Sequence, residues 1–183
     1  MIDANNGYNL NLARRVLAET ADARIYWIEE PFHEDARLYA ILQEWLDEQS
    51  LDTLIADGEG DASPRLLDYA RDGLIDIVQY DVLRPGFSRW LELGPQLDAW
   101  AVRSAPHHYG EPYGNYACGH LAGAIKGFQM VEWDHAEVPG LDVSAYRISE
   151  GLVHLPNAPG FGLALDDALY ARAVAEQGFV VAS

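Results

Sequence analysis

The stretch RIYWIEEP, residues 24–31, is a short apolar run that stops at two acids and a proline. Two further runs have the same form, since MID at the N-terminus stops at Asp3 and LIADGE stops at Glu59. A stretch of helical spacing follows each run. In a β/α barrel, this order of elements brings the strand ends, and with them Asp3, Glu29 and Glu59, to one mouth. Three convergent carboxylates repel one another unless a cation holds them, and oxygen ligands of this kind suit Mg²⁺.

On either side of that stretch, short apolar runs alternate with stretches in which apolar residues recur at helical spacing. The spacing is clear at residues 35–49, where Leu38 and Leu42 share one helix face. Ser63 can cap a further helix whose first residue is Pro64, a favoured placement. Strands that alternate with helices of this length pair in parallel through right-handed crossovers. The sequence therefore predicts strands at 24–28, 54–56, 75–80, 101–105 and 128–133, and helices at 9–20, 35–49, 64–71, 88–100 and 116–125.

The pattern changes after the last predicted strand, where Pro and Gly become frequent. Residues 138–161 have no sustained periodicity, so we expect a long irregular excursion there. Helical spacing returns at residues 164–177. A short apolar tail is expected at residues 179–182.

The bulk composition limits the classes of function. The chain has 183 residues, 49% of them hydrophobic, which is enough for a sizeable core in one domain. Its formal net charge is −17, so nucleic acid, which needs a basic footprint, is not an expected partner. No stretch reaches transmembrane length, and Cys118 is the only cysteine, so no disulfide can form within the chain. These features favour a cytoplasmic protein that makes no contact with a membrane.

Further strand ends carry residues that can move protons. Asp81 ends the run IDIVQYD, and His107 and His108 end AVRSAPHH on the next predicted strand. A histidine in isolation is more often structural, but adjacent barrel strands would place Asp81 beside a histidine at the same mouth. A carboxylate that accepts from one imidazole nitrogen orients the ring and leaves the other nitrogen to move a proton. Glu132 ends the following run FQMVEW, so six successive strand ends carry a candidate residue.

This ordered set resembles the C-terminal barrel of the enolase superfamily, in its mandelate racemase and muconate lactonizing branch. The matching pieces are DAN, WIEEP, the GE before residue 60, YDVLRPGFSRW and APHH. GLVHLPNAPGFGLALD is similar to the family's terminal segment, which returns to close over the barrel. The resemblance implies the α/β class and a (β/α)8 TIM-type barrel, incomplete here because the chain begins at about the third strand. It also implies a partial barrel with the site residues at 1–135, and at 136–183 a C-terminal segment that packs back on the barrel or on the absent capping domain.

The resemblance assigns roles to residues of this chain. His107 is the general base or acid, chosen over His108 because the family's histidine directly follows the proline. Asp81 is the partner of His107 in an Asp–His dyad, and Glu132 matches an acid that faces the substrate. The Mg²⁺ ligands implied by the resemblance are Asp3, Glu29 and Glu59.

The chemistry implied by the resemblance is removal of the proton next to a carboxylate, through an enediolate. Loss of a β-hydroxyl then gives a dehydratase, and reprotonation on the opposite face gives a racemase or epimerase. Cycloisomerases and dipeptide epimerases of the superfamily use lysines on both sides of the site, whereas Lys126 is the only lysine here and lies at the wrong end of the barrel. Arg84 substitutes poorly, because a guanidinium stays charged. The resemblance therefore favours a lyase, a sugar-acid (hydroxy acid) dehydratase that acts on a small carboxylate substrate.

Several alternatives stay open. A racemase or epimerase of a hydroxy acid would use the same residues. The family pattern includes two earlier strands, a second base and a capping domain that this sequence lacks, so a truncated, non-catalytic metal-binding barrel is a further possibility. An incomplete barrel exposes two strand edges, which a homo-oligomer or the remainder of a longer chain would cover. The strand-end acids could also be ordinary turn residues of an unrelated α/β domain.

Overall fold

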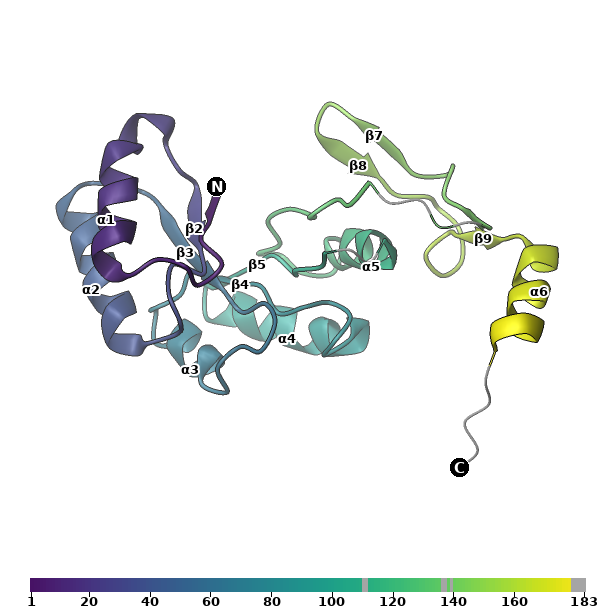
Figure 1. The fold of residues 1–183 in the computed structure, drawn as a ribbon, viewed down its shortest axis with the longest axis horizontal. Helices are drawn as coiled ribbons and strands as arrows, with labels where there is room; N and C mark the ends of the chain where they lie inside the picture. Colours follow the sequence, from purple (N-terminus) through teal and green to yellow (C-terminus); the bar gives the residue numbers. More distant parts are fainter. Residues whose placement is uncertain (110–111, 136–137, 139, 179–183) are drawn as a thin grey trace.

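The computed structural model describes residues 1–109, 112–135, 138 and 140–178 of the chain (Figure 1). At its centre is a five-stranded parallel sheet in which each strand pairs with the next strand in sequence. Consecutive parallel pairing with intervening helices is the arrangement of a β/α barrel, so the predicted fold class, an incomplete barrel, is confirmed. The strands are β1 (Ile2–Asp3), β2 (Trp27–Glu29), β3 (Leu54–Asp57), β4 (Ile77–Val78) and β5 (Arg103–Ser104).

The predicted sixth strand, residues 128–133, is formed only at its start. Phe128 makes a single parallel bridge to Ser104, and Gln129 N donates to Ser104 O at 2.9 Å. The residues that follow belong to no strand. The prediction of a full strand was therefore wrong, because an apolar run marks an extended, partly buried segment but does not ensure that a neighbour pairs with it.

Helices cover the outside of the sheet (Figure 1). Asn9 Oδ1 accepts from Leu12 N at 3.0 Å and caps the first helix, and Asp35 caps the second in the same way. Their apolar faces pack into one core, in which Tyr39 and Trp90 are fully buried. The helices are α1 (Leu10–Glu19), α2 (Ala36–Glu48), α3 (Leu66–Arg71), α4 (Phe87–Ala99) and α5 (Tyr113–Leu121), with a 3₁₀ turn at Ala21–Ala23.

Two of these helices differ from the prediction by two or more residues at an end. α3 begins at Leu66, and Ser63 caps only the turn before it, since its Oγ accepts from Arg65 N at 3.2 Å. α5 begins at Tyr113 and ends at Leu121, earlier than predicted at both ends. Helix ends depend on local hydrogen bonds that apolar spacing does not determine, so such shifts are expected.

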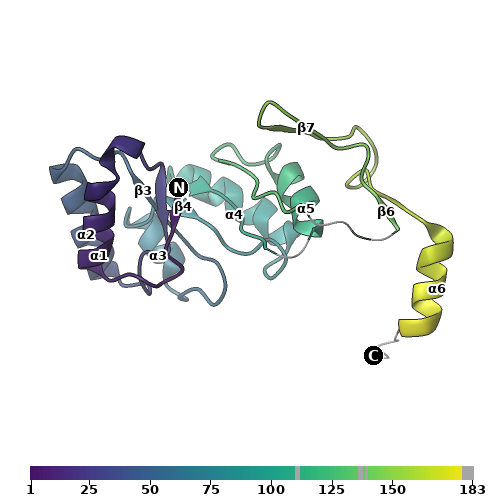
Figure 2. The same ribbon diagram turned by 45° about the horizontal axis from the view of Figure 1, so that its top comes forward.

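Residues 140–178 extend away from the barrel as an arm of short elements (Figures 1 and 2). The expectation of an irregular excursion was wrong in part, because it contains a β-hairpin that turns at Glu150 and Gly151, both with positive φ. The predicted helix that follows is present, and the predicted tail at 179–182 lies outside the described residues. The described chain contains no helix that is both long and apolar enough to span a bilayer. The elements of the arm are β6 (Leu141–Asp142), β7 (Arg147–Ser149), β8 (Leu152–His154), β9 (Ala164–Leu165) and α6 (Asp167–Gln177).

Two aromatic residues attach the arm to the helices of the barrel. The Tyr146 ring lies 4.8 Å from that of Tyr116 in α5, and the Tyr146 hydroxyl lies 3.1 Å from His120 Nε2. Phe161 packs at 5.3 Å on His120 and at 5.3 Å on Phe87 of α4. The division of the chain into a barrel and a separately packing C-terminal segment stays a prediction.

Gly94 of α4 lies where this helix packs against the residues that follow α5. A Cβ at position 94 would lie 2.6 Å from Ile125 Cδ1, closer than real contacts allow. We expect Gly94→Ala to lower the free energy of unfolding by about 1–3 kcal/mol through overpacking, in spite of the better helix propensity of Ala. Urea denaturation measures this loss. Gly123→Ala is the matched control, because its Cβ would meet no atom closer than 3.6 Å; an equal loss in the two variants would contradict the packing explanation.

Candidate active site

The carboxyl ends of the parallel strands bring the predicted residues to one edge of the sheet. Asp3 and Glu29 are register partners at the ends of β1 and β2. Glu59 follows the end of β3 by two residues. Beyond β4 and β5, an isolated parallel bridge pairs Asp81 with His107. The topology therefore collects these side chains at one end of the partial barrel.

Asp81 and His107 form a hydrogen-bonded pair. His107 Nδ1 lies 2.6 Å from Asp81 Oδ1. The second oxygen of Asp81 accepts from Gly60 N at 3.0 Å and lies 3.6 Å from Arg84 Nε. A carboxylate held on both sides fixes the orientation of the imidazole ring. Because Nδ1 is engaged, Nε2 is the ring atom that can transfer a proton.

Two more carboxylates lie near Nε2 of His107. Glu59 Oε2 is 3.1 Å from this nitrogen and Glu132 Oε2 is 3.7 Å from it. Glu132 Oε2 also accepts from His108 N at 3.2 Å, which fixes its direction. Burial lowers the pKa of His107, but the hydrogen bond to Asp81 and the negative charges of Glu59 and Glu132 outweigh burial and raise it above its ordinary value.

The carboxylates of Asp3, Glu29 and Glu59, at or just beyond the ends of the first three strands, have the chemistry that a hard divalent cation requires. Burial raises the pKa of Glu59, His107 opposes this rise, and the charges of Glu29 and Asp3 add to it. The acids thus repel one another, and oxygen-only ligands are those that Mg²⁺ prefers. Among the described residues, no three Asp, Glu, His or Cys side chains are grouped closely enough to hold a metal ion, and Glu59 Oε2 contacts His107 Nε2. The residues that would hold Mg²⁺ are Asp3, Glu29 and Glu59.

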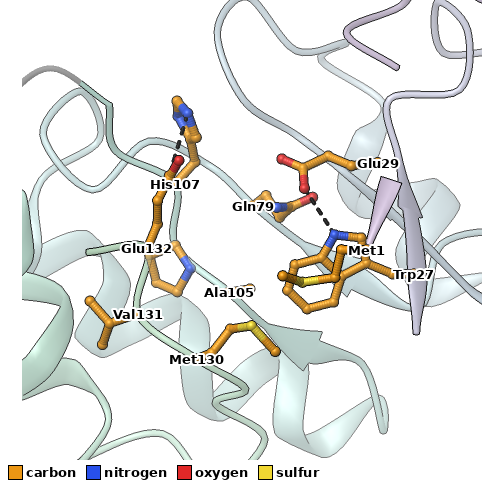
Figure 3. A pocket seen from close by; sticks show the side chains of 10 residues that line it. Met1, Trp27, Glu29, Gln79, Ala105, His107, Met130, Val131 and Glu132 are labelled. Atoms are coloured by element: carbon orange, nitrogen blue, oxygen red, sulfur yellow. Dashed lines mark hydrogen bonds and ion pairs between the residues drawn. The ribbon is translucent and has the colours of Figure 1, made fainter. Parts of the chain in front are cut away.

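A cavity of about 160 Å³ lies directly beneath the strand-end residues (Figure 3). Glu29 and His107 lie on opposite sides of this cavity in the figure. Trp27 and Gln79 line it below Glu29, and the small side chain of Ala105 leaves room between the two sides. The remaining lining residues are Met1, Pro106, Met130, Val131 and Glu132.

Two buried acids next to the site were not among the predicted catalytic residues and metal ligands. Asp57 at the end of β3 is 1% exposed, and its Oδ2 accepts from the Tyr39 hydroxyl at 2.6 Å. Burial raises the pKa of Asp57 to about 7 and that of Glu30 to about 8. The only sequence signal for either residue was its place at the end of an apolar run.

His108 and Lys126, which were not assigned to the site from the sequence, lie in different surroundings. His108 is buried beside α5, and neither of its ring nitrogens has a hydrogen-bond partner in the described structure. Burial lowers the pKa of His108, so its neutral form is favoured. Lys126 is exposed, and its backbone N–H donates to Asp98 near the end of α4, where the chain enters the next strand. It therefore lies at the opposite end of the strands from His107.

We expect Asp81→Asn to lower the pKa of His107 in the metal-free protein. Burial alone lowers this pKa, and the carboxylate of Asp81 is the first of the groups that raise it, so its removal shifts the balance downward. NMR titration of the imidazole protons measures the change. Asp61→Asn is the matched control, because Asp61 is exposed and pairs with Arg84 rather than with the ring. A pKa of His107 that is equal in the parent and in Asp81→Asn would contradict the assigned pairing.

The same pair predicts a pH dependence of stability. The pKa of His107 is raised by folding, so the protonated ring stabilises the fold at pH values below its unfolded pKa of about 6.5. This contribution is lost as the pH rises through the folded pKa. In Asp81→Asn the corresponding fall in the free energy of unfolding is expected to be smaller.

The comparisons with known proteins agree with the observed fold. The family model described as "Enolase C-terminal domain-like" matches residues 1–169. A galacturonate dehydratase from Geobacillus sp., solved with D-galacturonate and 5-keto-4-deoxy-D-galacturonate, is 52% identical with a TM-score of 0.95, over 97% of this chain and 48% of that chain. A mutant of a galacturonate dehydratase from Geobacillus sp., solved with Mg, is 51% identical with a TM-score of 0.95, over 97% of this chain and 47% of that chain.

A third solved structure extends the range of bound ligands. A mandelate racemase/muconate lactonizing protein from Geobacillus sp. Y412MC10, solved with magnesium and tartrate, is 52% identical with a TM-score of 0.96, over 98% of this chain and 46% of that chain. The chain therefore spans about half the length of these solved relatives. No curated protein matches it.

Proposed function

The chain belongs to the enolase C-terminal domain-like family, and from this premise we propose that it carries the catalytic half of a Mg²⁺-dependent sugar-acid dehydratase. The observation that carries the proposal is the Asp81–His107 pair, held at 2.6 Å at the strand ends that also bear three acids. The likeness to galacturonate dehydratases at 51–52% identity supports a hexuronate as the substrate. The protein is then an enzyme of the lyase class.

In the proposed reaction, a sugar acid loses the proton next to its carboxylate and the hydroxyl on the following carbon. Mg²⁺ bound to Asp3, Glu29 and Glu59 would stabilise the negative charge that develops on the substrate carboxylate. His107 Nε2 accepts the α-proton, or delivers a proton to the departing hydroxyl, while Asp81 holds Nδ1. Water leaves, and the resulting enol becomes a 2-keto acid.

Glu132 is proposed to face the substrate across the cavity. Its Oε2 is held by His108 N at 3.2 Å and lies 3.7 Å from His107 Nε2, so it lies within reach of the same reacting atoms. The cavity between His107 and Glu29 supports this placement (Figure 3). The partner is therefore a small carboxylate, while assembly into a homo-oligomer or with the remainder of a longer chain stays a prediction.

The test is a turnover assay of the protein that carries this chain, with Mg²⁺ and a panel of sugar acids that includes D-galacturonate. We expect a keto-deoxy acid to form, detected as its semicarbazone. If the protein binds Mg²⁺ but turns over none of the sugar acids, the result would contradict the proposed dehydratase activity and favour the non-catalytic alternative.

A racemase or epimerase is the second candidate, because a 52% identical relative is a mandelate racemase/muconate lactonizing protein solved with tartrate. Incubation with hydroxy acids in D₂O separates the two reactions. Exchange of the α-proton with no loss of water would favour the racemase, whereas formation of a keto acid favours the dehydratase.

A further inference from the structure

We propose that Trp27 is a positioning residue, whose indole N–H holds the Glu29 carboxylate for the cation and so sets the affinity for Mg²⁺. The inference rests on the proposed function, because it concerns one of the proposed ligands. It assigns a role to a residue that the sequence predicts only as part of the strand at 24–28.

The alternation of side chains along β2 creates the contact. Residues two apart on a strand point to the same face, so Trp27 and Glu29 both face the interior of the partial barrel. Trp27 Nε1 donates to Glu29 Oε2 at 2.9 Å (Figure 3). A hydrogen bond to an ionised acceptor is stronger than one between neutral groups. It engages one oxygen of Glu29 and leaves Oε1 for another partner.

The indole is itself firmly held. Trp27 is 4% exposed and packs in a small cluster with Ala56, Ile77 and Ala105 inside the partial barrel. Its ring also packs at 5.5 Å on Tyr26. A donor whose rotamer is fixed by packing can orient its acceptor without further loss of conformational freedom.

The other two acids are held differently. Asp3 Oδ1 accepts from Asn5 N at 2.8 Å, within its own loop, and Glu59 contacts His107. In the part of the chain that the structure describes, Trp27 is the single hydrogen-bond donor to the side chain of Glu29. Mutation of a residue that hydrogen-bonds to a metal ligand and orients it typically lowers the affinity for the metal by about 10–100-fold.

The experiment measures binding of Mn²⁺ alone, by electron paramagnetic resonance, to the parent protein and to Trp27→Phe. Phe retains most of the apolar packing but has no N–H donor. We expect the Kd for Mn²⁺ to rise about tenfold or more, with a melting temperature within a few degrees of that of the parent. An unchanged Kd in a folded Trp27→Phe would overturn the inference and leave the proposed function standing.

Trp45→Phe is the matched control, because Trp45 lies in α2, away from the strand ends, where its partly buried ring packs on Arg14. We expect this variant to bind Mn²⁺ as the parent does; an equal rise of the Kd in both variants would overturn the specific role of Trp27. A parent protein that fails to bind Mn²⁺ would overturn the proposed function, and this inference with it.

A second measurement keeps the inference testable even if Trp27→Phe does not fold. In the parent protein labelled with ¹⁵N at tryptophan, the indole N–H that donates to a carboxylate gives a downfield signal. We expect this signal to shift when Mg²⁺ is added, because the cation withdraws charge from Glu29. If the protein binds Mg²⁺ but no indole signal shifts, the hydrogen bond from Trp27 to Glu29 is not coupled to metal binding, and the inference is overturned.

Discussion

Replacing His107 with Asn is expected to reduce kcat for sugar-acid dehydration by about 10²–10⁴-fold, the usual contribution of a general acid or base. Asn can still accept or donate a hydrogen bond near Asp81, but it has no group that takes up a proton at neutral pH. Binding of Mg²⁺ should persist, since His107 is not among the three proposed ligands. Steady-state kinetics and metal titration on the same preparation measure the two effects separately.

His154→Asn is the control for this change, because His154 lies on the exposed β8 hairpin strand and pairs with Ser149. We expect it to leave kcat unchanged. Turnover by His107→Asn at the rate of the parent would remove this histidine from the reaction and, with it, the interpretation of the Asp81–His107 pair.

Replacing Glu59 with Gln is expected to weaken Mg²⁺ binding by at least about 100-fold. Loss of a residue that only hydrogen-bonds to a metal ligand costs up to about 100-fold, and loss of a ligand itself should cost at least as much. Affinity for such cations depends on the number of charged ligands, and this change removes one of three negative charges. Turnover at a fixed Mg²⁺ concentration should fall by on the order of 10³-fold, as expected when a main electrostatic contribution is lost. Titration calorimetry with Mg²⁺, followed by the turnover assay, measures both.

The metal-free form of Glu59→Gln supplies a second readout. Glu59 is one of the carboxylates that raise the pKa of His107, so this pKa should fall in the variant. Glu92→Gln is the control, because Glu92 is exposed on α4 and pairs with Arg89. If Glu59→Gln bound Mg²⁺ as tightly as Glu92→Gln, the proposed ligand set would be wrong.

The strand ends show how far the sequence alone could go. An apolar run that stops at an acid marks both the end of a strand and the residue placed there, so Asp3 and Glu29 were predicted at neighbouring strand ends. Parallel pairing then follows from the alternation of runs and helical stretches. The one cap that was predicted, Ser63, was misplaced, because α3 begins at Leu66 and Ser63 caps only the turn before it.

What could not be predicted depends on contacts between distant side chains. The contact of Glu59 with His107 involves an imidazole 48 positions later in the sequence. The burial of Asp57 depends on Tyr39 of α2. The hairpin of β7 and β8 was missed because its strands are largely exposed, so they carry little of the apolar alternation on which strand prediction rests.

The contact between Trp27 and Glu29 could be predicted from the sequence only in part. The spacing of two residues on a predicted strand places both side chains on one face, so their proximity could be inferred. Which part of the indole faces the carboxylate, the N–H or only the apolar ring, depends on packing against Ala56, Ile77 and Ala105. A tryptophan two positions before a strand-end acid therefore merits attention in other sequences of this form.

The most direct test of the account is a crystal structure of the protein that carries this chain, grown with Mn²⁺ and measured at a wavelength where manganese scatters anomalously. We predict one anomalous peak that is in contact with carboxylate oxygens of Asp3, Glu29 and Glu59, with His107 across the cavity from it. A peak bound elsewhere, or three carboxylates that point to different sides and share no ion, would contradict the central claim.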